Sequence, residues 1–142
     1  MVAATTIVHA LESAGYRLTS PRRAIAELVA ARRAPFTAEQ LLAESRLRRL
    51  GVTRATVFRS LDVLLELGCV ERLDLPKGDH AFVACEPAHH HHIVCSSCGR
   101  SREVEDNGLD AVAAAIERQS GYRVDTHRLE LFGLCGACRS AA

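Results

Sequence analysis

TRATVFRSLDVLLELG (residues 53–68) and CVERLDLPKGDHAFVAC (residues 69–85) together form the stretch that decides the fold. Thr53 is a residue type that caps helices, and valine and leucine recur behind it at helical spacing until Gly68 stops the pattern. Two short apolar runs then flank Pro76–Asp79, an arrangement typical of a two-stranded hairpin. A helix that leads into such a hairpin predicts the end of a winged helix-turn-helix unit.

Three more short helices are expected ahead of this stretch. Thr5–Ala14 is amphipathic, and a second helix should begin at Thr19–Pro21, where a hydroxyl residue stands beside a proline suited to the first turn, and end near Pro35. Thr37–Gln40 matches a capping box and predicts a third helix that Gly51 closes. The first half is therefore helical up to the hairpin.

The second half mixes strands and one helix. Strands are expected at Ile93–Val94 and Glu103–Val104, and apolar residues at helical spacing predict a helix from Leu109 to Ile116. Strand patterns return between Tyr122 and Leu134. The predicted fold class is α+β, with a winged-helix domain followed by a small α/β domain.

Charge divides the chain in the same way. The 142 residues carry 18 Lys and Arg against 17 Asp and Glu, a net charge of only +1, which taken alone argues against nucleic acid as a partner. Residues 1–68, however, hold ten basic and six acidic residues, and residues 69–142 hold eight and eleven, so the halves carry +4 and −3. Two domains with different partners are therefore expected, one over 1–85 and one over 86–142, with a hinge at about 84–89.

All six cysteines lie in the second half, and four form the pairs Cys95/Cys98 and Cys135/Cys138. No export signal or membrane-spanning run is visible, so a cytoplasmic protein is expected, and in a reducing cytosol such pairs indicate metal. Four thiolates can close a tetrahedral zinc site with no open position, which indicates a structural ion. The alternatives are a redox pair, buried free thiols, or a secreted disulfide scaffold.

Four consecutive histidines, residues 89–92, precede the first cysteine pair. In an extended segment, alternation sends His89 and His91 to one face and His90 and His92 to the other, so the histidines can serve two sites. The first predicted site is a regulatory zinc centre formed by Glu71, Cys85, His90 and His92. The second is a weaker site formed by His89, His91, Asp110 and His127. Its alternative is a solvated histidine cluster without metal.

The helix after Thr53 carries the candidate DNA contacts. Arg54, Phe58 and Arg59 project from the side opposite the leucines, and arginine and an apolar ring suit guanine edges, phosphates and thymine methyl groups. Arg17 and Arg22, around the start of the second helix, are candidate phosphate contacts. The alternatives are that Phe58 belongs to the core and that these arginines are ordinary surface charges.

These motifs resemble the ferric uptake regulator superfamily over nearly the whole chain. The resemblance rests on Gly15–Arg22, Thr37–Leu41, Ala55–Leu61, His89–Cys98 and Cys135–Cys138. Within the superfamily the chain is most similar to zinc uptake regulators, because Cys85 stands where iron and peroxide sensors usually have a carboxylate. Pro35–Phe36 also occupies the place where iron sensors commonly carry a histidine.

The resemblance implies a homodimeric repressor that binds double-stranded operator DNA when loaded with zinc and controls zinc-acquisition genes. It also implies that each protomer binds two to three zinc ions in the three ligand sets above. It implies no membrane partner and no small-molecule substrate. Two departures from the family pattern affect operator preference and zinc affinity: Phe58 replaces the usual tyrosine, and Glu71 stands where zinc sensors often have aspartate.

Two other classes of function are weighed against this one. One is an iron-, manganese- or nickel-responsive regulator of the same fold. The other is a zinc carrier or zinc hydrolase, but the chain has no His-Glu-x-x-His helix, nucleophile elbow or phosphate loop, so it is not expected to be an enzyme.

Overall fold

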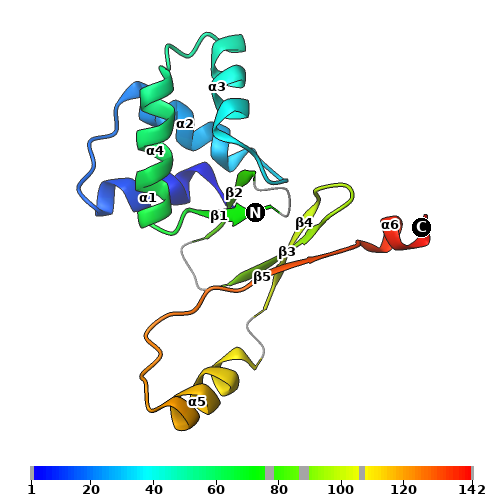
Figure 1. The fold of residues 1–142 in the computed structure, drawn as a ribbon. Helices are drawn as coiled ribbons and strands as arrows, with labels where there is room; N and C mark the ends of the chain where they lie inside the picture. The colour runs from blue at the N-terminus through cyan, green and yellow to red at the C-terminus, as the bar shows by residue number, and fades with distance from the viewer. Residues whose placement is uncertain (1, 76–78, 87–89, 106–107, 142) are drawn as a thin grey trace. The chain divides into compact units, whose positions relative to one another are not determined.

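The computed structural model describes residues 2–75, 79–86, 90–105 and 108–141, and the chain divides into two compact units, Met1–Ala88 and His89–Ala142. The first unit contains four helices and a two-stranded sheet, and the second contains a three-stranded sheet and two helices (Figure 1). The α+β prediction is confirmed. No helix among the described residues is long and apolar enough to cross a membrane.

The helices of the first unit begin where capping residues allow. They are α1 (Ala4–Ser13), α2 (Ser20–Ala30), α3 (Ala38–Leu47) and α4 (Arg54–Glu66). Thr19, Thr37 and Thr53 each accept a hydrogen bond from a backbone N–H in the first turn of the helix that follows, which satisfies a donor that the helix itself cannot pair. At α3 the predicted capping box is complete, because the Gln40 side chain also accepts from the Thr37 N–H at 2.8 Å.

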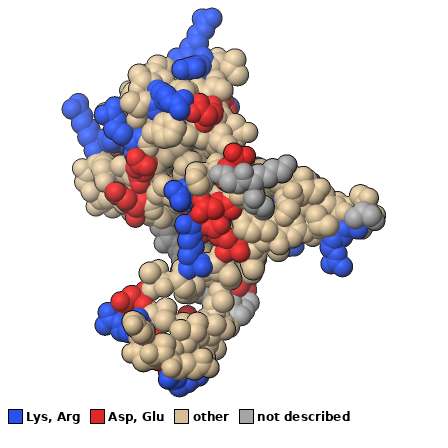
Figure 2. All heavy atoms as spheres, in the orientation of Figure 1, with Lys and Arg blue, Asp and Glu red and all other residues tan. Residues whose placement is uncertain are grey.

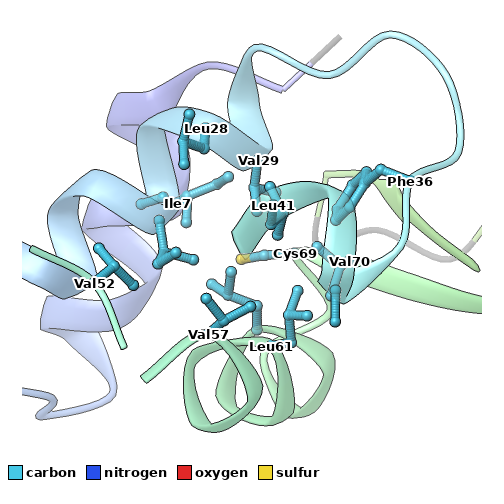
Figure 3. Close-up of a cluster of buried hydrophobic side chains, with 14 of the residues drawn as sticks. Ile7, Leu28, Val29, Phe36, Leu41, Val52, Val57, Leu61, Cys69 and Val70 are labelled. Carbon is cyan, nitrogen blue, oxygen red and sulfur yellow. The ribbon is translucent and has the colours of Figure 1, made fainter. Parts of the chain in front are cut away.

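The four helices share one apolar core, shown in Figure 3. Its buried side chains include Ile25 of α2, Leu41 of α3, and Val57 and Leu61 of α4, each at most 1% exposed. Burying a side chain of this size contributes about 1.5–3 kcal/mol relative to leaving it in water. The apolar spacing of these helices therefore positions α4 with its opposite side facing solvent.

The wing is the hairpin of β1 (Val70–Asp74) and β2 (His80–Ala84). The two strands are antiparallel with Val70 opposite Ala84, and the Cys85 N–H donates to the Cys69 carbonyl at 3.0 Å, which extends the ladder by one pair. The predicted turn falls largely on residues 76–78, outside the described residues.

The second unit is built on a sheet with the strand order β4-β3-β5. Strand β3 (His91–Cys95) is antiparallel to β4 (Ser101–Val104) and parallel to β5 (Glu130–Gly133). Helix α5 (Leu109–Ser120) lies between β4 and β5 in the chain, and the short helix α6 (Gly136–Ser140) follows β5.

The structure differs from the sequence predictions in several details. Helix α2 ends at Ala30 and not near Pro35. Helix α3 ends at Leu47 and not at Gly51, because Arg49 takes a left-handed backbone with φ 54°. The region between Tyr122 and Leu134 forms only the four-residue strand β5, so His127 lies before a strand and not within one. Helix α6 was not predicted, since its five residues carry no measurable periodicity.

Replacing Leu61 with alanine should destabilise the first unit by about 2–5 kcal/mol, because it leaves a cavity among the core side chains of α4. Urea unfolding followed by helical circular dichroism measures this change. The matched control is Leu47→Ala in α3, since Leu47 is 84% exposed and its truncation should change the free energy of unfolding by less than about 0.5 kcal/mol. Equal losses for the two variants would contradict the assigned core.

Candidate metal centres and nucleic-acid face

The two cysteine pairs converge in the second unit. Cys95 ends β3, Cys98 lies just beyond it, Cys135 caps α6, and Cys138 lies within α6. All four sulfur atoms lie within 4.8 Å of one another, and the Cys98 and Cys135 sulfurs are 3.8 Å apart. The sheet and the helix thus bring together two pairs of thiols that are separated by 36 intervening residues in the chain.

The surroundings of the cluster shift its pKa values in opposite directions. The backbone of Cys98 and then that of Cys135 lower the pKa of the Cys95 thiol to about 6, and the Cys135 N–H lies 3.4 Å from the Cys95 sulfur. The backbone of Cys138 lowers the pKa of Cys135. The Ser97 hydroxyl lowers the pKa of Cys138, but the neighbouring thiols outweigh it and raise that pKa to about 11. Close thiols cannot all ionise together, so they titrate in separate steps.

The donor set fits a tetrahedral zinc ion. Zinc binds thiolate sulfur at about 2.3 Å, which places the sulfurs of a tetrahedron about 3.8 Å apart, and this is the spacing of Cys98 and Cys135. A divalent cation would also remove the mutual repulsion that opposes ionisation of the fourth thiol. With four thiolates the ion would have no open position for a substrate.

The four ligands predicted for the regulatory site are divided between the two units. Glu71 lies on β1 opposite Val83, and Cys85 follows β2, where it is 3% exposed and lies 3.6 Å from the Gly68 carbonyl oxygen. In the second unit the rings of His90 and His92 lie edge to face, with centroids 4.8 Å apart. Alternation along an extended chain places these two rings on the same side, as predicted.

The weaker predicted site is partly assembled. The Nε2 atoms of His91 and His127 are 3.1 Å apart, and the two ring planes are inclined by 34°. Asp110 lies in the first turn of α5, and among the described residues it forms no group with the two histidines in which every ligand atom lies within 4.8 Å. His89 lies outside the described residues.

The predicted DNA-contacting side chains lie on the solvent side of α4. Phe58 is 39% exposed, which rules out the alternative that it belongs to the core. The Arg54 guanidinium lies 5.0 Å above the Phe58 ring, a favourable cation–π geometry. Arg59 is exposed, and its Nε donates to the Ala55 carbonyl at 3.3 Å. Figure 2 shows basic side chains over the helices of the first unit, with acidic ones among them.

A surface hollow of about 230 Å³ separates the start of α2 from α4. Its lining residues are Thr19, Pro21, Arg22, Thr56, Arg59 and Ser60. The Arg22 Nη1 donates to the Arg17 carbonyl at 2.6 Å, which holds this side chain against the loop before α2. Two cations beside a helix N-terminus, where backbone N–H groups point outward, suit a phosphate.

One contact on this face was missed from the sequence. Glu39, in the first turn of α3, forms an ion pair of 2.6 Å with Arg54. The two residues are 15 positions apart on different helices, so no periodic pattern could have indicated the pair.

Replacing Cys95 with serine should remove about one equivalent of zinc per chain and lower the melting temperature, because a hydroxyl is a poor fourth ligand for this ion. Metal analysis after dialysis and a thermal melt provide the two readouts. Cys69→Ala is the control, since Cys69 is buried in the first unit and lies outside the four-sulfur cluster. Full zinc content in the Cys95→Ser protein would contradict the assignment.

Comparison with known proteins gives a consistent result over most of the chain. Residues 13–132 match the "Ferric uptake regulator family". A "Zinc uptake regulation protein" from Mycobacterium tuberculosis is 35% identical over 130 residues, covering 92% of this chain and all of the relative. A "Ferric uptake regulation protein" from Bacillus subtilis is 34% identical over 134 residues, covering 90% and 89%.

Among solved structures, the crystal structure of "holo XcZur" has a TM-score of 0.73 at 30% identity and covers 97% of this chain and 99% of its own. The match therefore extends over both units and is not confined to the winged helix. The chain belongs to the ferric uptake regulator family.

Proposed function

We propose that this protein is a zinc-responsive transcriptional repressor that binds operator DNA as a metal-loaded homodimer and controls zinc-acquisition genes. The observation that carries the proposal is that one chain of this family contains both a four-thiol cluster and a helix whose solvent side presents Arg54, Phe58 and Arg59. The full-length similarity to a zinc uptake regulation protein supports zinc as the metal that is sensed. The proposed division of labour assigns DNA binding to 1–85 and dimerisation to 86–142, with the hinge at about 84–89.

The metal sites have separate roles in this proposal. A structural zinc is held by Cys95, Cys98, Cys135 and Cys138. A regulatory zinc is held by Glu71, Cys85, His90 and His92. A further ion is held more weakly by His89, His91, Asp110 and His127. Each protomer then binds two to three zinc ions.

The identity of the sensed metal rests on Cys85. Overall similarity does not decide it, because the zinc and ferric relatives are 35% and 34% identical to this chain. A site with one thiolate, one carboxylate and two imidazoles carries two negative charges that balance a divalent cation, and its thiolate favours zinc over manganese or magnesium.

The regulatory ion is proposed to act by linking the two domains, because its ligands come from both sides of the hinge. Glu71 and Cys85 belong to the winged helix, whereas His90 and His92 belong to the segment that follows the hinge. One ion bound by all four fixes the winged helix to the dimerisation domain and so sets the spacing of the two DNA-binding heads. Zinc then favours DNA binding to the extent that it binds this arrangement better than others.

Homodimerisation is supported by apolar surface that the second unit leaves exposed. None of the twelve residues of α5, all of them described, is buried, and Val112 and Ile116 are 52% and 49% exposed. On the sheet, Ile93 and Phe132 are also exposed. An amphipathic helix with no buried side chain gains little stability from tertiary packing, so a second copy of the chain is the proposed cover.

The remaining parts of the proposal follow from the DNA-binding role. Arg17, Arg22, Arg54, Phe58 and Arg59 are the proposed contacts to operator DNA. The protein is not an enzyme and acts in the cytoplasm, where the operator is.

The experiment that tests the sensed metal uses the purified protein at buffered free concentrations of zinc, iron(II), manganese and nickel. Fluorescence anisotropy with an operator duplex reports binding. Zinc should raise affinity at lower free concentration than the other metals. Activation by another metal, or hydrolytic activity without DNA binding, would contradict the proposal.

Replacing Cys85 with serine should raise the free zinc concentration needed for DNA binding by at least about tenfold, because loss even of a group supporting a ligand costs about 10–100-fold. Zinc at the four-cysteine cluster should be retained. Cys69→Ala is the matched control, since Cys69 lies directly opposite Cys85 across the hairpin and is equally buried. An unchanged zinc response in Cys85→Ser would remove Cys85 from the sensing site.

Replacing Arg59 with alanine should weaken operator binding by about 1–3 kcal/mol, since its guanidinium lines the hollow proposed to take DNA. Arg33→Ala is the control because Arg33 is also exposed but lies in the segment that follows α2 and does not line that hollow. Anisotropy titrations of both variants at saturating zinc make the comparison. Equal affinities for the two variants would contradict this placement of DNA.

A further inference from the structure

The exposed side of α4 holds an acidic group from another helix. The Glu39 carboxylate of α3 lies 2.6 Å from the Arg54 guanidinium, and the same guanidinium lies 5.0 Å above the Phe58 ring. Arg54 is therefore held from two directions, by a carboxylate and by an aromatic face. The two charged side chains are 61% and 59% exposed, so DNA that approaches α4 meets both.

This ion pair is not needed to begin or to stabilise the helices. Thr37 and Gln40 already form the capping box of α3, and Thr53 caps α4. Exposed ion pairs contribute little to folding, because water screens the charges and two long side chains lose freedom. An acidic side chain in the first turn of α3 also interacts favourably with the helix dipole, but this does not depend on its contact with Arg54. The contact itself bears on what Arg54 can bind.

A guanidinium has five N–H donors, and Glu39 occupies those of one terminal nitrogen, so Arg54 keeps donors for a base edge. A phosphate is different, because it is an anion that must either displace the Glu39 carboxylate or lie beside it. Base contacts carry sequence information, whereas phosphate contacts give affinity for any duplex. The Glu39 carboxylate therefore weakens a contact between Arg54 and a phosphate, which any duplex offers, more than a contact between Arg54 and a base edge, which depends on sequence.

From this geometry we infer that Glu39 is a specificity-determining residue, which positions Arg54 over Phe58 for a base edge and weakens binding to non-operator DNA. The inference rests on the proposed function, since it concerns how the same DNA face distinguishes sequences. Glu39 acts through Arg54 and is a positioning residue.

The test compares two duplexes of equal length with the zinc-loaded protein. One is an operator duplex selected by the wild-type protein from random sequences, and the other is a scrambled duplex. Glu39→Gln keeps the shape and an acceptor oxygen but removes the charge. It should bind the scrambled duplex about three- to fivefold more tightly, the size expected for one exposed ion pair, and change operator affinity by less than about twofold. The salt dependence of scrambled binding should steepen as Arg54 becomes available to phosphate.

Glu12→Gln is the matched control, because it removes the same charge from an exposed position on α1 that forms no ion pair within the described parts of the chain. It should change both affinities by the same factor. In an Arg54→Ala background, Glu39→Gln should alter the operator-to-scrambled ratio no more than Glu12→Gln does. Thermal melts confirm that all variants are folded.

The inference would be overturned if Glu39→Gln and Glu12→Gln had the same ratio of operator affinity to scrambled-duplex affinity. It would also be overturned if Glu39→Gln still changed this ratio in the Arg54→Ala background. If either result is found while zinc still promotes operator binding, the role of Glu39 is contradicted and the proposed function is not. Wild-type binding that does not respond to zinc contradicts the proposed function, and the comparison of Glu39→Gln with Glu12→Gln still decides the role of Glu39.

Discussion

Four cysteine sulfurs within 4.8 Å of one another cannot all be thiolates unless a cation lies among them. The raised pKa of Cys138 expresses this constraint, because the neighbouring thiols outweigh the lowering effect of the Ser97 hydroxyl, whereas the backbone of Cys98 and Cys135 lowers the pKa of Cys95. The rest of the second unit depends on this constraint, because the cluster ties the end of β3 to α6 and so closes the small sheet. In the described part of this unit the buried apolar residues are only Val94 and Cys95, too few to hold a fold by burial alone.

The first unit, in contrast, has a large apolar core. Its helices and wing bury a continuous apolar core, and threonines cap three of its four helices, so burial and capping stabilise it. Because α4 packs on the core through its other side, Arg54, Phe58 and Arg59 face solvent and are available for function. The net charge of +1 conceals this arrangement, because a basic half and an acidic half cancel.

Local features of the sequence predicted most of this structure. The threonine caps, the apolar spacing of α4, the hairpin and the spacing of Cys95/Cys98 each depend on residues close together in the chain, and all were found in the expected places. Features that depend on distant residues were harder to predict. The pairing of Glu39 with Arg54 joins two helices and was not predicted. His91 and His127, 36 positions apart, were predicted to share a site from their ligand chemistry and not from their spacing. A local feature was missed as well, because Arg49, whose left-handed backbone ends α3 early, is a residue type that rarely adopts that conformation. The strand pattern predicted between Tyr122 and Leu134 is confirmed only at β5, because alternating residues need a neighbouring strand before they form a ladder.

In the proposed function, one zinc ion holds the second unit together while another controls DNA binding. The most direct measurement follows zinc content and operator affinity together as the wild-type protein is exposed to chelators of increasing strength. The account predicts that a mild chelator removes the regulatory zinc and abolishes operator binding, while one zinc per protomer remains and the fold is unchanged. Loss of all zinc in a single step with unfolding, or operator binding that persists after the first zinc is removed, would contradict it.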